Sequence, residues 1–205
     1  MTVTRLEQQL RFILEIDKLK SIQRRSTLIN GERRENSAEH SWHITVMAMT
    51  LAEYANEEVD LLRTVQMLLI HDIVEIDAGD TFAYDTQGRQ SQAEREQAAA
   101  EHLFGLLPAD QAAVYSALWH EFEAAATAEA KLANAVDRLM PLLHNYYNDG
   151  GTWRENSVNR ARVEERVGAI EAGSTTLWSV AQQVLDEAVA KGYLSNANEE
   201  ESGQA

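Results

Sequence analysis

Apolar residues recur with helical spacing along most of the chain. Between about Val3 and Lys20, for example, Leu6, Leu10 and Ile13 fall close to one stripe of a helix. The same spacing predicts further helices over about 36–52, 58–76, 89–107, 108–124, 127–146, 156–171 and 174–190. Only two prolines and ten glycines interrupt 205 residues, and good helix formers recur throughout. The pattern therefore predicts an all-α fold, a single-domain bundle of about eight helices.

The segment from about Ser21 to Glu35 lacks this period, and we interpret it as a loop. It contains the turn-forming pair Asn30-Gly31, and arginine stands at positions 24, 25, 33 and 34. A basic segment in an acidic chain is a natural contact for an anion. Asn36 and Glu39 then predict a capping pair that opens the next helix.

The charge of the chain narrows the range of partners. A formal net charge of −15 makes the surface at large repel polyanions, so we expect neither a nucleic acid polymer nor an anionic membrane as a partner. Glu7, Glu15 and Asp17 interrupt the N-terminal apolar positions, which argues against a signal peptide or a membrane span. We expect a cytoplasmic protein with an ordered domain over residues 1–192 and an acidic, disordered tail over 193–205.

An adjacent pair, His71 and Asp72, stands within the most apolar predicted helix. A buried charge costs several kcal/mol unless it is paired, and a bound cation would supply the partner. His40 and Asp137 lie in two other helices with apolar faces, so three helices could bring these side chains to one ion. The chain has no cysteine, which restricts a transition metal site to nitrogen and oxygen ligands.

Each of these residues also has a simpler interpretation. The His71-Asp72 pair could reach solvent near a helix end. His40 could be a helix-terminal histidine with satisfied hydrogen bonds, and Asp137 could form a salt bridge to a neighbouring arginine.

Three segments carry a resemblance to a known family. Their sequences are RRENSAEHSWH at 33–43, LLIHDIVEIDAGDTFAYD at 68–85 and ANAVDRLMPLLHN at 133–145. In this order they resemble the HD-domain superfamily and, within it, the small hydrolases related to bacterial 5′-deoxynucleotidase. The resemblance implies an HD-type helical bundle that forms a homodimer.

The resemblance also implies a metal centre and an activity. The ligands of the family map onto His40, His71, Asp72 and Asp137. They would hold one divalent ion, which could be Mn, Co, Fe, Ni, Zn or Mg. The implied reaction is the hydrolysis of a phosphomonoester, in which a metal-activated water releases phosphate from a deoxynucleoside 5′-monophosphate.

Three further residues take roles from the same resemblance, and a fourth departs from it. Glu75, one helical turn after His71, matches a glutamate that assists the chemistry, although it could instead form a buried salt bridge to an arginine. Asp80 matches a residue that approaches the sugar, although an Asp after a Gly is also a common turn residue. Arg25 stands at the position of a phosphate-binding arginine. Ser26 departs from the family, which places there a tryptophan that helps to hold the nucleoside.

Two other functions remain open on the sequence. One is a sensor that binds a nucleotide in the same pocket without turnover. The other is an oxygen-using di-iron enzyme, which would need His102 and His120 as additional ligands.

Pro141 cannot donate a hydrogen bond to the Asp137 carbonyl, which predicts a kink or local opening there. His144, two turns beyond Asp137, could line the site or make a structural hydrogen bond.

Overall fold

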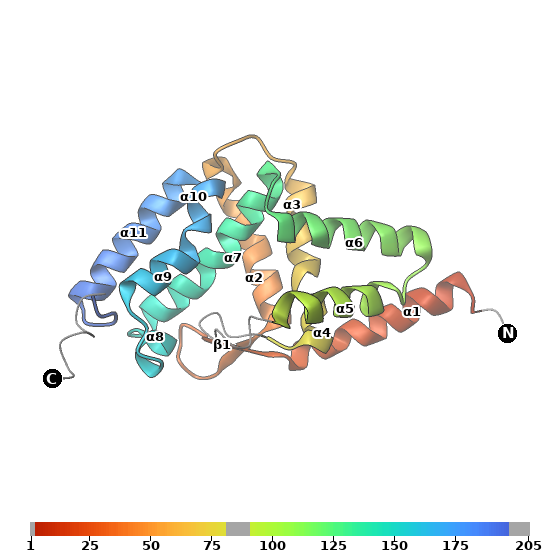
Figure 1. Ribbon diagram of the computed structural model, residues 1–205, viewed down its shortest axis with the longest axis horizontal. Coiled ribbons are helices and arrows are strands. Elements are labelled where there is room, and N and C mark those ends of the chain that lie inside the picture. Colours follow the sequence, from red (N-terminus) through yellow and green to blue (C-terminus); the bar gives the residue numbers. More distant parts are fainter. Residues whose placement is uncertain (1–2, 81–90, 197–205) are drawn as a thin grey trace.

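The computed structural model describes residues 3–80 and 91–196, and helices dominate it (Figure 1). In chain order the elements are α1 (Arg5–Glu15), η1 (Ile16–Ser21), β1 (Gln23–Thr27), β2 (Arg34–Asn36), α2 (Ser37–Leu51), η2 (Ala52–Tyr54), α3 (Leu61–Ile70), η3 (His71–Val74), α4 (Glu75–Ala78), α5 (Gln92–Phe104), α6 (Ala109–Ala124), α7 (Ala128–Tyr147), α8 (Gly151–Glu155), α9 (Arg160–Val167), α10 (Ala169–Gly173) and α11 (Thr175–Ala190). Here η marks a short 3₁₀ helix. The all-α prediction is confirmed.

Helix α7 is the centre of the molecule, and other helices cover it on two sides (Figure 1). Ala133, Val136 and Met140 pack on one side in a core shared with α2, α3, α5 and α6. Leu139 and Leu142 pack on the other side in a core shared with α9, α10 and α11. Because a 3.6-residue period places these two sets on different faces, α7 is buried almost all round. Asp137 therefore stands on the most enclosed helix of the fold.

Close packing of α10 against α7 depends on a glycine. Gly173 lies so near the Lys131 carbonyl and the Ala135 side chain that a Cβ at this position would overlap them. The absence of a side chain allows the two backbones to approach. This contact holds the C-terminal helices on the face of α7 opposite to α3 and α6.

The predicted loop over Ser21–Glu35 contains a short hairpin instead. Strands β1 and β2 pair antiparallel, with Gln23 opposite Asn36 and Thr27 opposite Arg34. The turn uses Gly31 with a φ of 74°, a left-handed conformation that glycine adopts at low cost. The Asn30-Gly31 pair is typical of hairpins, and the polar strands lack an apolar alternation that would have identified them.

Two predicted helices break at points that matter for the site. The helix expected over 58–76 ends at Ile70, continues as the 3₁₀ turn η3 and resumes as α4, which stops at Gly79 with a φ of 75°. The N-terminal helix also ends early, at Glu15, and continues as η1. The first break places His71 and Asp72 on a tight turn, where adjacent side chains can face one centre.

The described residues near the C-terminus extend the packed region beyond 192. Leu194 is buried, and the Tyr193 hydroxyl donates a hydrogen bond to Asp149 Oδ1 at 2.6 Å. Leu194 is apolar and packs between helices, so these first residues of the predicted tail belong with the domain. The remaining part of that prediction, residues 197–205, lies outside the described residues, as do residues 89–90 at the start of the helix predicted over 89–107. Among the described helices, none combines the length and apolarity that a bilayer crossing requires.

Candidate metal centre

His40 is fixed in the first turn of α2 by the start of that helix. Asn36 is the N-cap, and Glu39 completes the predicted capping box, with each side chain accepting a backbone N–H of the other residue. The His40 ring is fully buried, and its Nε2 lies 2.9 Å from Asp137 Oδ1 on α7. Its other nitrogen, Nδ1, lies 3.3 Å from Glu35 Oε2. The imidazole is therefore held between two carboxylates.

His71 is oriented by the backbone of the helix that precedes it. Its Nδ1 donates a hydrogen bond to the Leu68 carbonyl at 2.9 Å, which leaves Nε2 as the ligand atom of the neutral ring. Nε2 lies 2.9 Å from Asp72 Oδ1 and 3.7 Å from Asp137 Oδ1. Within the described residues this buried nitrogen makes no hydrogen bond, so it faces the carboxylates with its bonding capacity unused.

Asp137 comes from the middle of α7, one turn before Pro141. The helix runs on to Tyr147, so the proline does not end it, although Pro141 removes the N–H that the Asp137 carbonyl would normally receive. The Asp137 side chain is buried and also lies 3.4 Å from Arg138 Nη1 through Oδ2. The structure thus brings all four predicted ligands together from α2, η3 and α7.

The electrostatics of the four side chains favour a cation among them. Burial alone would lower the pKa of His71, but the Asp72 and Asp137 carboxylates outweigh it and raise that pKa to about 10. Burial opposes ionisation of Asp137 as well, yet Arg138 and the two histidines hold its pKa well below the usual range. These shifts show that the surroundings of His71 and Asp137 favour positive charge beside the carboxylates.

A divalent ion fits this donor set. The ligand atoms of His40, His71 and Asp72 lie within 4.8 Å of one another, and two imidazoles with two carboxylates suit first-row divalent metals. His71 Nε2 lies 2.9 Å from Asp72 Oδ1 and 3.7 Å from Asp137 Oδ1, so nitrogen and oxygen donors from η3 and α7 face one another. The described residues thus hold a complete set of four nitrogen and oxygen ligands.

Arg24 is the arginine that reaches this centre. It extends from β1, and its Nη1 donates a hydrogen bond to Asp72 Oδ2 at 2.7 Å. The same guanidinium lies 3.7 Å from Glu75 Oε1 and, through Nε, 3.8 Å from Glu35 Oε2. Its side chain is only 13% exposed, so the contact is a buried ion pair rather than a screened surface one.

Glu75 is buried at the start of α4, on the side of the centre that faces β2. Its Oε2 accepts a hydrogen bond of 2.5 Å from the Ser37 hydroxyl. Burial, together with the negative charge of Asp72, raises the pKa of Glu75 to about 8 despite the nearby Arg24. The carboxyl group can therefore both hold and release a proton near neutral pH.

A cavity of about 420 Å³ is lined by three of the four ligands, His71, Asp72 and Asp137. Asp80 and Arg25 line it, as do Ser26 and Trp153. Burial raises the pKa of Asp80, although Arg24 opposes this shift. The cavity is large enough to hold a small organic molecule next to the ligand cluster.

The described residues place the two further histidines elsewhere. His102 is exposed on α5, and its Nδ1 lies 2.5 Å from Asp77 Oδ2. His120 is exposed on α6. Neither belongs to a described cluster of metal-ligating side chains. The arrangement thus offers no support for the di-iron interpretation.

A family model described as HD domain matches residues 16–178. This chain belongs to the HD domain family. The matched segment contains His40, His71, Asp72 and Asp137, which are called the HD centre from here on.

Two proteins named 5′-deoxynucleotidase HDDC2 are similar to this chain in sequence. The 5′-deoxynucleotidase HDDC2 of Bos taurus is 31% identical over 136 residues, which cover 65% of this chain and 64% of that protein. The human protein of the same name is 29% identical and covers 65% of each chain. The chain thus spans slightly less than two-thirds of the length of these curated relatives.

Two solved structures resemble this HD domain. A predicted metal-dependent phosphohydrolase from Magnetospirillum magnetotacticum MS-1 is 57% identical, with a TM-score of 0.87 over 93% of this chain and 98% of that one. A conserved hypothetical protein from Pyrococcus furiosus is 22% identical, with a TM-score of 0.60 over 85% of this chain and 98% of that one. The second likeness shows the fold alone.

Two residues that contact the HD centre were not assigned a role by the sequence. Glu35 lies behind His40, and Arg24 lies against Asp72. Glu35 belongs to the RRENSAEH segment that carries the resemblance, and its place in that segment, five residues before His40, is the local signal for it. For Arg24 the sequence offers only its presence among four arginines, since nothing local distinguishes it from Arg25.

Proposed function

We propose that this protein is a metal-dependent phosphomonoester hydrolase that releases phosphate from deoxynucleoside 5′-monophosphates. The observation that carries the proposal is the convergence of two histidines and two aspartates beside a cavity that arginines also line. The names of the relatives, 5′-deoxynucleotidase and predicted metal-dependent phosphohydrolase, support this reaction class.

His40, His71, Asp72 and Asp137 would hold one divalent ion. When bound, such an ion supplies positive charge that polarises the phosphate and lowers the pKa of a coordinated water. Leu68 keeps the His71 ring in the tautomer that a ligand needs, through its 2.9 Å hydrogen bond. Asp72 has a second task, because its Oδ2 holds the Arg24 guanidinium at the cavity wall.

Glu75 would move the proton in the reaction. Its raised pKa and its position at the cavity wall suit a group that takes a proton from the attacking water or gives one to the leaving oxygen. Ser37 holds the carboxyl group in place by donating to Oε2. The salt bridge considered for Glu75 coexists with this role, since Arg24 lies 3.7 Å away.

The basic hairpin would receive the phosphate, and Asp80 would face the sugar. Arg25 lines the cavity together with Arg24, so guanidinium groups stand on the wall where a dianion needs charge. Asp80 lines the same wall. Ser26 of β1 also lines the cavity and is much smaller than the tryptophan of the family. Trp153 of α8 supplies an aromatic side chain to the lining.

Arg25→Ala is expected to raise KM about tenfold, because a charge-assisted hydrogen bond contributes roughly 1.5 kcal/mol or more. Metal content should not change, since Arg25 is not part of the ligand set. The measurement is steady-state kinetics with a deoxynucleoside 5′-monophosphate. Arg33→Ala is the matched control, because Arg33 pairs with Glu39 at 2.6 Å and does not line the cavity. An unchanged KM would move the phosphate contact to Arg24.

A phosphate-release screen tests the proposed reaction. The purified full chain is assayed with ribo- and deoxynucleoside 5′-monophosphates while Mn, Co, Fe, Ni, Zn or Mg is added in turn. We expect release from the deoxynucleotides that depends on the added ion. Binding of nucleotides without release under every ion would contradict the enzyme and favour the sensor.

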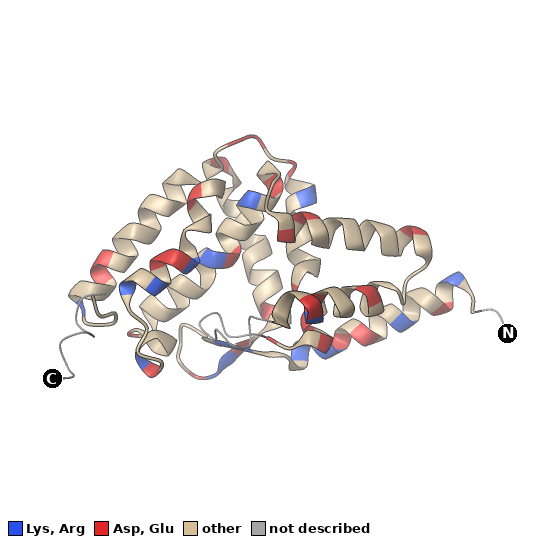
Figure 2. Cartoon of the chain, viewed as in Figure 1, with Lys and Arg blue, Asp and Glu red and all other residues tan. Residues whose placement is uncertain are grey.

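The remaining proposals concern the cellular location, oligomeric state, domain extent and partners of the protein. We propose a cytoplasmic homodimer in which the HD-type domain extends past the predicted boundary at 192 to include Tyr193 and Leu194, and an acidic tail follows it. Support for a second copy comes from exposed apolar side chains on two packed helices, Trp42 and Met49 of α2 with Leu62 and Leu69 of α3. Charges of both signs alternate along the outer helices α1 and α9 (Figure 2). This mixture and the net charge of −15 support a small phosphorylated substrate rather than a nucleic acid polymer or a membrane.

A further inference from the structure

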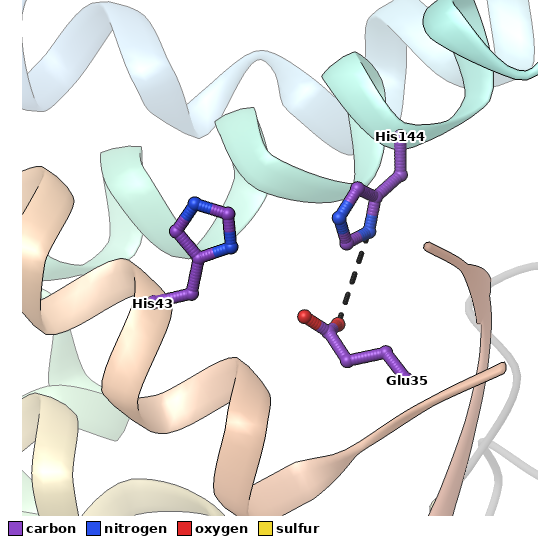
Figure 3. Close-up of side chains that lie close together, drawn as sticks. All are labelled: Glu35, His43 and His144. Carbon is purple, nitrogen blue, oxygen red and sulfur yellow. Dashed lines mark ion pairs between the residues drawn. The ribbon is translucent and has the colours of Figure 1, made fainter. Parts of the chain in front are cut away.

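A second group of ligand-type side chains lies behind the HD centre. It consists of Glu35 from β2, His43 from α2 and His144 from α7 (Figure 3). The potential ligand atoms of these three residues all lie within 4.8 Å of one another. Figure 3 shows both imidazole rings and the carboxylate turned toward a shared space between the three elements. The cluster shares no residue with the four ligands of the HD centre.

Two buried polar atoms of this cluster have no hydrogen-bond partner among the described residues, although one of them, Glu35 Oε2, lies 3.3 Å from His40 Nδ1. Glu35 Oε2 and His144 Nδ1 are both buried and make no hydrogen bond within the described part of the chain. The residues that carry them are 1% and 2% exposed. Leaving buried polar atoms without partners is costly, so a native fold normally supplies a partner for them.

The spacing in the cluster is too long for direct hydrogen bonds and short enough for coordination. Glu35 Oε2 lies 3.9 Å from His144 Nδ1, beyond the roughly 3.2 Å limit of a good hydrogen bond. An ion bound at roughly 2.0 to 2.2 Å from each atom would leave opposite ligands about 4 Å apart. A cation between the two atoms therefore satisfies both.

The chemistry of the donors selects the class of ion. Two imidazoles and one carboxylate form a ligand set typical of first-row transition metals, and water can complete the coordination. Neutral imidazole is the form of histidine that binds these metals, and His144 Nδ1 is buried without a hydrogen-bond partner among the described residues. His43 is only half-buried, so one ligand of the cluster is accessible to solvent.

We propose that Glu35, His43 and His144 form a second site for a divalent transition metal, separate from the HD centre. The site ties the hairpin, α2 and α7 together, and the same three elements position Arg24, His40 and Asp137. The two sites are in contact through Glu35, because its Oε2 lies 3.3 Å from Nδ1 of His40, a ligand of the HD centre. This inference does not depend on the substrate or on the reaction proposed above.

The test is the number of Zn²⁺ ions bound per chain at equilibrium. The full chain is freed of metal with a chelator and dialysed against Zn²⁺, and metal and protein are then measured in wild type and variants. We expect about two equivalents in wild type and about one in His43→Gln and in His144→Gln. Asp137→Asn should also retain about one, held at the second site. His120→Gln is the matched control and should keep the wild-type number, since His120 is exposed on α6.

The outcomes separate the second site from the HD centre. One equivalent in wild type, lost in Asp137→Asn, would overturn the second site while leaving the HD centre intact. Two equivalents in both His43→Gln and His144→Gln would also overturn it, because the ion would then have other ligands. His144 is buried and its variant could misfold, whereas His43 is half-buried and its variant decides the question by itself. Circular dichroism of each variant establishes that a lost equivalent does not come from a lost fold.

Discussion

Asp137→Asn is expected to lose the ion of the HD centre and to lower the rate of hydrolysis about 10²–10³-fold. A decrease of this size corresponds to several kcal/mol of lost transition-state stabilisation. Asparagine keeps the shape of aspartate but offers a neutral oxygen. Asp137 Oδ1 lies 2.9 Å from His40 Nε2 and 3.7 Å from His71 Nε2, so it stands between two other ligands. Metal content and phosphate release of the same preparation measure the effect.

Asp110→Asn is the control for this substitution. It makes the same chemical change at an exposed aspartate that pairs with Arg5 on the surface. Its metal content and rate should equal those of wild type. If Asp137 served only as a partner of Arg138, 3.4 Å away, Asp137→Asn would keep its metal and lower the unfolding temperature. That result would remove Asp137 from the ligand set.

Glu75→Gln is expected to lower kcat by about 10²–10⁴-fold, the range that general acid–base catalysis contributes. Glutamine can still accept the hydrogen bond from the Ser37 hydroxyl, but it cannot exchange a proton. Metal content should stay unchanged, because Glu75 is not among the four ligands. The rate should also lose any pH dependence that arises from a carboxyl group with a pKa of about 8.

The control for Glu75→Gln is Glu101→Gln, at an exposed position on α5. A purely structural role for Glu75 gives a different result. If the carboxylate only balanced Arg24, its replacement would lower the unfolding temperature and leave kcat and its pH profile in place. Unfolding curves and pH–rate profiles of the two variants therefore distinguish proton transfer from charge balance.

Arg24 illustrates a limit of reasoning from the sequence. The resemblance assigned phosphate binding to Arg25, and the adjacent arginine is the one that contacts Asp72. Both arginines line the cavity, but neighbouring residues of a strand point to opposite faces, so the pairing register of β1 with β2 decides which guanidinium reaches Asp72. That register depends on contacts between strands and leaves no periodic signal in these polar segments.

The sequence by itself determined the helical class, the capping pair at Asn36 and Glu39, and the order of the four ligands of the HD centre. These features are local or are carried by short motifs, because helix periodicity and capping involve residues at most a few positions apart. Only the tertiary structure decided that η3 interrupts the helix at His71 and that Glu35 lies within reach of both His40 and His144. Glu35 and His144 are more than a hundred positions apart, and packing of the hairpin against α7 brings them together. Such a contact follows from the closure of the whole fold, which no local pattern encodes.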